Sequence, residues 1–143
     1  GLAASVFMAT AGVVVFLSGR LTDKIKETEL IVATGYAIMG VGFFAYTTVN
    51  SVGELLLIQV VIGLGQALCS PAFDALYSKH VNPDKSGSQW GAWESINYFA
   101  LAFGALAGSA VASIFGFSTL FVVMGCFALM SAGYIYFLPR KVL

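Results

Sequence analysis

Long runs without a charged residue most constrain what this chain can fold into. The first eighteen residues carry no charge, and neither does the run from Leu30 to Gly53. A helix needs about 20 apolar residues to cross the hydrocarbon core of a membrane, and in lipid its backbone polar groups must be satisfied within the helix itself. We therefore predict an all-α polytopic membrane helix bundle, with spans at residues 1–18, 30–49, 53–78, 90–115 and 117–138.

The composition agrees with a lipid environment and argues against several other classes of protein. Only 10% of the residues are charged and the mean hydropathy is +0.89, whereas soluble domains carry about a quarter of charged residues. The net charge is zero, so nothing indicates nucleic acid as a partner. The sequence shows no metal-ligand spacing and no nucleophile–base pair. We therefore expect no enzyme activity, no metal and no cofactor.

The basic residues predict the orientation of the chain in the membrane. All seven fall on one side if each apolar run crosses: Arg20, Lys24, Lys26, Lys79, Lys85, Arg140 and Lys141. Connectors rich in Lys and Arg face the cytoplasm. We expect an integral protein of the cell (inner) membrane with cytoplasmic charged loops, and Glu54 at the outer surface near a helix N-terminus. Because the chain opens on glycine inside an apolar run, we interpret residues 1–143 as a single transmembrane domain fragment.

Small residues predict how the helices pack. In the fourth run they recur every four residues, which places them along one helix face: Ala100, Gly104, Gly108, Ala112 and Gly116. Lipid gives no hydrophobic drive for helices to associate, so close backbone approach at small residues supplies the contact. This face is a packing seam within one protein, or alternatively a homodimer seam. The stretches "GYAIMGVG" and "GLGQA" predict close crossings of the second and third helices as well.

Polar residues inside the predicted spans are few, and they are the candidate cavity or coupling residues: Gln59, Gln66, Asp74, Glu94 and Asn97. Intramembrane polar groups are costly and usually face the protein interior or a water-filled cavity. Gln66 would lie near the middle of the membrane and contact either a cavity or another helix. Asp74 and Glu94 lie near the cytoplasmic side, where a solvated interfacial position is the alternative. Trp93 and Tyr98 fit the interfacial aromatic belt.

The first charged connector resembles a known signature. "GRLTDKIKE" is similar to G-x-L-x-D-[RK]-x-G-[RK]-[RK] of the major facilitator superfamily of transporters, with matches at Gly19, Leu21, Asp23 and Lys24. The sequence departs from the signature over residues 26–28, where the second glycine and the closing basic pair are replaced.

Three further stretches resemble the same family in the same order. "QVVIGLGQA" is similar to its fourth-helix R-x-x-x-G-x-G-x-A, with Gln59 in place of the arginine. "SPAFDALYSKHVNPDKSGSQWG" resembles its P-x-x-R-G-x-x-x-G loop, with Ser86 at the arginine position. "FGALAGSAVASIFGF" resembles its fifth helix G-P-x-x-G-G, with Ala105 in place of proline. Because this copy is degraded, we favour helices eight to twelve of a full transporter, with helices two to six as the alternative.

The resemblance implies a fold and a function. The family consists of two six-helix halves that rock about a mid-membrane site, so this chain would be part of one half, with the remaining half of the same transporter as its partner. The implied function is secondary active transport of a small solute, as uniporter, symporter or antiporter, with a proton or sodium ion as the coupling ion. A non-transporting receptor or assembly protein of the same fold is the alternative.

The resemblance also assigns roles to the connector. Asp23 would be the acid of a cytoplasmic latch that faces a helix end of the opposite half, and Arg20 and Lys24 would be its local partners. Gly19 would allow a tight exit from the first span. The latch must be weak, because a partly exposed ion pair contributes at most about 1 kcal/mol.

Overall fold

The computed structural model describes residues 1–139, and over this range it is built from five α-helices, two short 3₁₀ helices and no strand. The helices are α1 (Leu2–Thr22), α2 (Thr28–Ala45), α3 (Val52–His80), α4 (Ser86–Phe115) and α5 (Phe117–Phe137), with η1 (Tyr46–Thr48) and η2 (Pro83–Lys85) in the connectors. Each of the five α-helices is long and apolar enough to cross a membrane. The all-α membrane bundle predicted from the sequence is therefore confirmed.

Helices extend past the apolar runs where the connectors are charged. α1 continues to Thr22 rather than residue 18, α3 reaches His80, and α4 begins at Ser86 rather than Trp90. Helical hydrogen bonds continue beyond the lipid, and basic side chains in a last turn interact favourably with the helix dipole. Arg20 lies in the last turn of α1, and Lys79 and His80 in that of α3. Arg140 and Lys141 lie outside the described residues.

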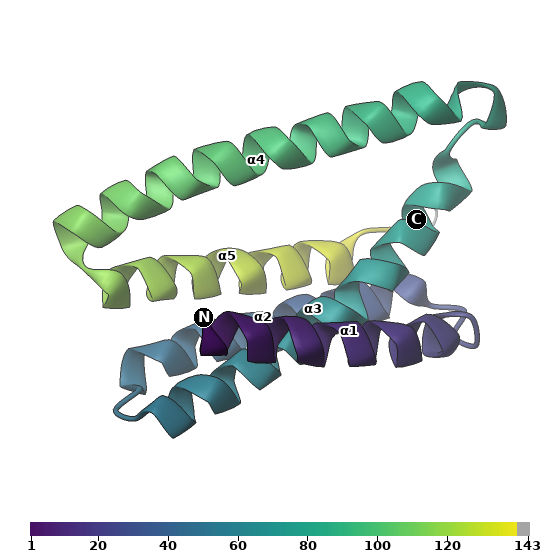
Figure 1. Ribbon diagram of the computed structural model, residues 1–143. Helices are drawn as coiled ribbons and strands as arrows, with labels where there is room; N and C mark the ends of the chain where they lie inside the picture. Colours follow the sequence, from purple (N-terminus) through teal and green to yellow (C-terminus); the bar gives the residue numbers. More distant parts are fainter. Residues whose placement is uncertain (140–143) are drawn as a thin grey trace.

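The two charged connectors lie at the same end of the bundle (Figure 1), as alternating helix directions require. At the opposite end, Ser51 caps the start of α3. Its Oγ accepts a hydrogen bond from the Glu54 backbone N–H at 3.2 Å, and Glu54 Oε2 accepts one from the Asn50 N–H at 2.8 Å. Reciprocal bonds of this kind satisfy amides that have no partner inside the helix.

α2 and α3 cross at two glycines. A Cβ added to Gly35 would lie 2.7 Å from the Gly65 carbonyl oxygen, and a Cβ added to Gly65 would lie 2.7 Å from the Gly35 oxygen. No side chain fits between the two backbones, so the close crossing predicted from "GYAIMGVG" and "GLGQA" is present. The core next to it consists of Ile31, Val32, Met39, Ile58, Ile62, Cys69 and Ala72.

α1 and α5 pack on either side of this pair. α1 approaches α3 at Gly63, where an added Cβ would lie 3.3 Å from the Phe7 carbonyl oxygen. α5 approaches α2 at Gly125, where an added Cβ would lie 2.8 Å from the Phe44 ring. Close backbone approach at small residues thus holds α1, α2, α3 and α5 together, as expected where lipid provides no hydrophobic drive.

α4 differs from the other helices. Figure 1 shows it running alongside the rest of the bundle at a distance, joined at its two ends, and none of its 30 residues is buried. Gly116 makes the corner to α5 with a φ of +85°, a conformation that favours glycine. Next to this corner, a Cβ added to Gly108 would lie 3.7 Å from Leu120 of α5. The middle of α4 contacts little else within residues 1–139.

Candidate functional site

The signature-like connector begins inside α1. Gly19, Arg20 and Leu21 belong to the last turn of the helix, which ends at Thr22. The Asp23 N–H donates to the Gly19 carbonyl at 3.2 Å, and the Lys24 N–H donates to that of Leu21 at 3.1 Å. Gly19 therefore does not make the tight exit that the resemblance implied. The chain leaves the helix at Asp23 and Lys24, because the hydrogen-bond pattern continues four residues past Gly19.

Four charged residues of the connector are exposed, namely Arg20, Asp23, Lys24 and Lys26. The Arg20 guanidinium carbon lies 4.8 Å from the centroid of the Phe16 ring one turn earlier, a cation–π contact within α1. Arg20 is thus held on its own helix rather than on Asp23. Within residues 1–139, the Asp23 carboxylate makes no hydrogen bond and no ion pair. Its exposed position leaves it able to meet a group outside this chain.

Gln59 and Gln66 share one face of α3. They are seven residues apart, and Phe73 follows Gln66 by another seven, a spacing that keeps side chains nearly in line on a helix. Gln66 is exposed and Gln59 is half-buried. Asp74, eight residues beyond Gln66, is turned from this line by about 80°. The two glutamines therefore lie on the side of α3 whose C-terminal end meets α4.

Asn97 lies on the corresponding face of α4. Trp93, one turn earlier, stacks on Phe73 of α3 with ring centroids 4.7 Å apart, so this face of α4 is directed toward α3. Asn97 and Glu94 are both exposed. Over residues 1–139, none of the five predicted polar side chains is hydrogen-bonded to another. The structure thus brings Gln59, Gln66 and Asn97 to facing sides of two helices without direct contact.

An aromatic cluster ties the end of α3 to the start of α4. It consists of Phe73, Tyr77, Trp90 and Trp93, with centroid distances of 4.7 to 6.4 Å. The Tyr77 hydroxyl donates to the Gln89 carbonyl at 2.8 Å, and the Asn82 N–H donates to Gln89 Oε1 at 2.7 Å. Trp93 is therefore half-buried in a helix–helix contact. Tyr98 is 69% exposed, as an aromatic belt residue would be.

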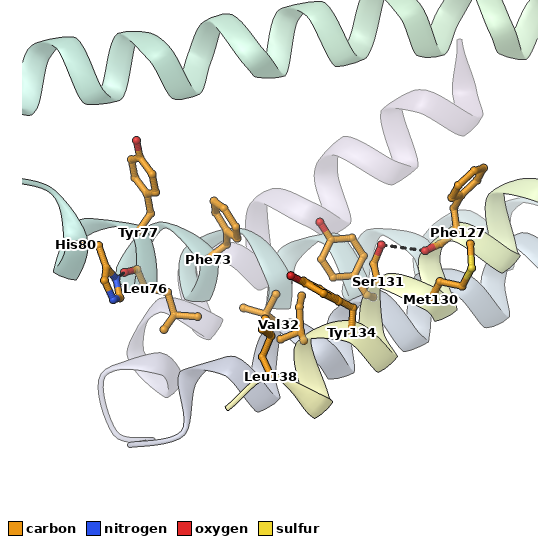
Figure 2. Close-up of a pocket in the computed structure, with 12 residues that line it drawn as sticks. Val32, Phe73, Leu76, Tyr77, His80, Phe127, Met130, Ser131, Tyr134 and Leu138 are labelled. Carbon is orange, nitrogen blue, oxygen red and sulfur yellow. Dashed lines mark hydrogen bonds between the residues drawn. The ribbon is translucent and has the colours of Figure 1, made fainter. Parts of the chain in front are cut away.

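An apolar groove of about 610 Å³ lies between α2, α3 and α5. Figure 2 shows the side chains that line it: Val32, Tyr36, Phe73, Leu76, Tyr77, His80, Phe127, Met130, Ser131, Tyr134, Ile135 and Leu138. The Ser131 hydroxyl donates to the Phe127 carbonyl at 2.9 Å, so it is satisfied within its own helix. None of the predicted polar residues lines this groove. The sequence feature that could have predicted this groove is the helical spacing of Phe127, Ser131, Tyr134 and Leu138, which places them on one face of α5 and just beyond its end.

The predicted small-residue seam of α4 contacts another helix only near the corner. A Cβ added to Gly104 would meet nothing within 4 Å, whereas Gly108 and Ala112 lie beside Leu120 and line a small cavity there. Because Gly104 lies eleven residues after Trp93, close to three full turns, the seam faces the inner side of α4.

Five long apolar helices with short connectors define a polytopic integral membrane protein. Residues 1–142 match the Major Facilitator Superfamily, and the chain belongs to this family of transporters. The resemblance seen in the sequence motifs is confirmed, and the fold is a partial helix bundle of this kind. The family assignment also agrees with the expectation that the chain is not an enzyme.

Two curated relatives are similar to part of the chain. Both are named proton-coupled antiporter flippase LtaA and come from two strains of Staphylococcus epidermidis. Each is 24% identical over 81 residues, which cover 57% of this chain and 20% of the relative. The chain thus matches about a fifth of the length of these relatives. No solved structure matches the chain significantly.

Proposed function

We propose that this chain is part of a secondary active transporter that moves a small solute across the cell membrane by alternating access. The observation that carries the proposal is the family match over residues 1–142. The signature-like connector at the end of α1 supports it, because Asp23 is exposed and its carboxylate makes no hydrogen bond or ion pair within residues 1–139. We propose that the charged connectors face the cytoplasm and that Asp23 forms a weak latch with the other half.

Gln66 is our leading candidate for a contact with the solute. It is the fifteenth of the 29 residues of α3, so it lies close to the middle of the span. An exposed amide at that depth is costly in lipid, which favours a water-filled cavity on this side of α3. Gln59 lies about two turns nearer the outer surface on the same face. Gln59 and Gln66 would line one wall of the solute pathway.

The face of α4 gives a reason to propose a further helix in the same half. Its small residues allow close backbone approach, yet an added Cβ on Gly104 would meet nothing within 4 Å. We propose that a helix from the remaining part of the transporter packs against this face and separates α4 from α3 and α5. The same helix would cover part of the groove shown in Figure 2.

We propose a proton as the coupling ion, because the curated relatives are named proton-coupled antiporters. Asp74 and Glu94 are the two carboxylates inside the predicted spans of this chain, apart from Glu54 at the start of α3. They are therefore its candidate proton carriers. Replacing each with its amide, Asp74→Asn and Glu94→Gln, tests the assignment. The variant of the residue that carries the proton should still exchange solute across the membrane, but its solute uptake should no longer depend on a pH gradient.

The proposal as a whole is tested by reconstituting the full-length transporter in liposomes that contain a trapped pH-sensitive dye. Candidate solutes are added outside, and solute-dependent proton movement is recorded. We expect Asp23→Asn to change the transport rate several-fold, with Asp84→Asn, an exposed acid in the other charged connector, as the matched control. A protein that moves neither protons nor any solute would instead support the non-transporting receptor or assembly protein.

A further inference from the structure

Pro71 leaves one carbonyl of α3 without a partner inside the helix. Proline has no N–H, so the bond from residue 71 back to the carbonyl of Ala67 cannot form. Ala67 is fully buried, with 0% of its surface exposed. A buried carbonyl without a donor is costly in a membrane, because lipid offers no hydrogen bond in exchange. Another group must supply the missing donor.

Ser18 of α1 supplies it. Its hydroxyl lies 2.6 Å from the Ala67 carbonyl oxygen, across 49 residues of sequence, and Ser18 is only 3% exposed. The alternative acceptor, the Val15 carbonyl in its own helix, is 3.2 Å away. A hydroxyl has one proton, and the shorter of the two bonds is the one to the Ala67 carbonyl of α3. Ser18 therefore stands in for the amide that Pro71 lacks.

This bond connects the signature-like connector to the cytoplasmic part of α3. The Ser18 carbonyl accepts a hydrogen bond from the buried Thr22 hydroxyl at 2.9 Å, one residue before Asp23. On the other side, Phe73 follows Pro71 by two residues and stacks on Trp93 of α4. A change of angle at Pro71 would move the start of α4 relative to the connector, and it would pull the Ala67 carbonyl away from Ser18.

We propose that Ser18 and Pro71 form a hydrogen-bonded joint between α1 and α3. The joint fixes the angle of α3 in the conformation described here, and Ser18 acts as a positioning residue for the connector that carries Asp23. Because no donor from lipid can replace the Ser18 hydroxyl, the bond is either formed or absent, which favours two discrete arrangements over a gradual bend. The role of the joint in alternating access rests on the proposed function, but its existence does not.

A double-mutant cycle in the full-length transporter tests the joint. Spin labels at Lys26→Cys and Ser88→Cys, two exposed positions in the connector and early α4, report the distance between these regions. The native thiols are removed as Cys69→Ala and Cys126→Ser. We expect Ser18→Ala to reduce about tenfold the population of molecules that have the spin-label distance of the conformation described here. This is the typical effect of losing one buried hydrogen bond.

The Pro71→Ala background gives the decisive comparison. Residue 71 then has an N–H that can bond to Ala67, so Ser18→Ala should change the distance populations less than about twofold. An equal effect of Ser18→Ala in both backgrounds, or no effect in either, would overturn the joint. Ser113→Ala is the control, since that exposed hydroxyl donates to the Ala110 carbonyl within α4 itself.

A second pair of variants guards against a failure to fold. The side chains of threonine and valine have nearly the same shape, and only threonine has a hydroxyl, so Ser18→Thr and Ser18→Val are compared. Thr should retain the distance distribution and thermal stability of the native protein, and Val should lose both unless Pro71→Ala is also present. Equal behaviour of Thr and Val would overturn the joint. If the native protein moves no solute while the effects of Ser18→Ala and Pro71→Ala still depend on each other, the proposed transport is contradicted and the joint is not.

Discussion

The α2–α3 pair and α4 are built from similar small and apolar residues, yet they differ in how they are packed. At the α2–α3 crossing, Gly35 and Gly65 bring two backbones into direct contact, and seven buried side chains surround them. α4 also carries glycines, with Gly104 and Gly108 four residues apart, and has no buried residue. Small residues therefore permit close approach but do not by themselves determine which helix is approached.

The difference is functionally informative. A transporter needs elements that remain together while others move, since alternating access is largely a rigid-body motion. The glycine crossing and the core around it have the properties of a fixed unit. α4 is joined to the other helices through the aromatic cluster at one end and the Gly116 corner at the other. Between these ends, its inner face carries small residues against which another helix could pack closely. The predictions below test this contrast, in order of decreasing effect.

The largest effect is expected at the glycine crossing. Gly65→Ala places a Cβ 2.7 Å from the Gly35 carbonyl oxygen and 3.0 Å from the Met39 amide nitrogen, and because these two are backbone atoms that no side-chain rotation can move away, the helices must separate. We expect a loss of about 3 kcal/mol in the free energy of unfolding, at the upper end of the usual cost of overpacking. Thermal unfolding in detergent measures it. The matched control is Gly133→Ala, whose Cβ would meet nothing within 4 Å; equal melting temperatures for the two variants would refute the crossing.

The next test concerns the inner face of α4. If a further helix of the full-length transporter packs on this face, Gly104→Leu should destabilise the full-length protein by about 2 kcal/mol through overpacking. Gly87→Leu, at the exposed start of α4, serves as the control. Cross-linking of cysteines placed at Gly104 and along the rest of the protein identifies the partner helix. A Gly104→Leu variant as stable as the native transporter would show that this face meets lipid.

A smaller effect is expected at the α3–α4 cluster. Trp93→Ala removes the rings' contacts to Phe73 and Tyr77, each worth about 0.5–1.5 kcal/mol beyond area burial. Hydrogen exchange of the first turns of α4 should rise, while that of the α2–α3 core stays unchanged. Tyr98→Ala, at a 69% exposed position, is the control. A uniform rise in exchange across all helices would contradict the separation of the two regions.

The smallest effect is expected at the N-terminal end of α3. Ser51→Ala removes the side-chain oxygen that accepts from the Glu54 N–H, and loss of such a cap costs about 1 kcal/mol. Ser88→Ala, near the start of α4, should cost less, because that hydroxyl donates to the Lys85 carbonyl and caps no amide. Thermal unfolding of both variants measures the difference. A larger loss of stability for Ser88→Ala than for Ser51→Ala would contradict the prediction.

Much of the architecture could be predicted from the sequence, because helix length and apolar composition are dictated by the membrane. The family resemblance was visible in Gly19, Leu21, Asp23 and Lys24, since these residues retain the spacing of the signature. The exit of α1 could not be predicted, because nothing local distinguishes a helix that ends at Gly19 from one that continues to Thr22. Within residues 1–139, a Cβ added to Gly104 would meet nothing within 4 Å, so what packs against this residue could not be predicted from this sequence.

The Ser18 contact shows where sequence reasoning was incomplete. A proline inside an apolar run, here Pro71, predicts a carbonyl without a helical partner four residues earlier, so this part could be predicted from the sequence. The donor is 49 residues away in another helix, so only the packing of α1 against α3 reveals it. The groove was also missed, because aromatic residues at helical spacing are common in buried cores.

The central claim, that this side of α3 lines an alternating-access pathway, is tested most directly by the accessibility of Gln66. In the full-length transporter with Cys126→Ser, a cysteine at Gln66 is exposed to a membrane-impermeant thiol reagent from either side of oriented vesicles. We expect labelling from both sides, with the two rates shifting in opposite directions when Asp23→Asn is added. A cysteine at Leu64, on the opposite face of α3, should stay unlabelled. Labelling of Gln66 from one side alone, with and without the Asp23→Asn change, would contradict the claim.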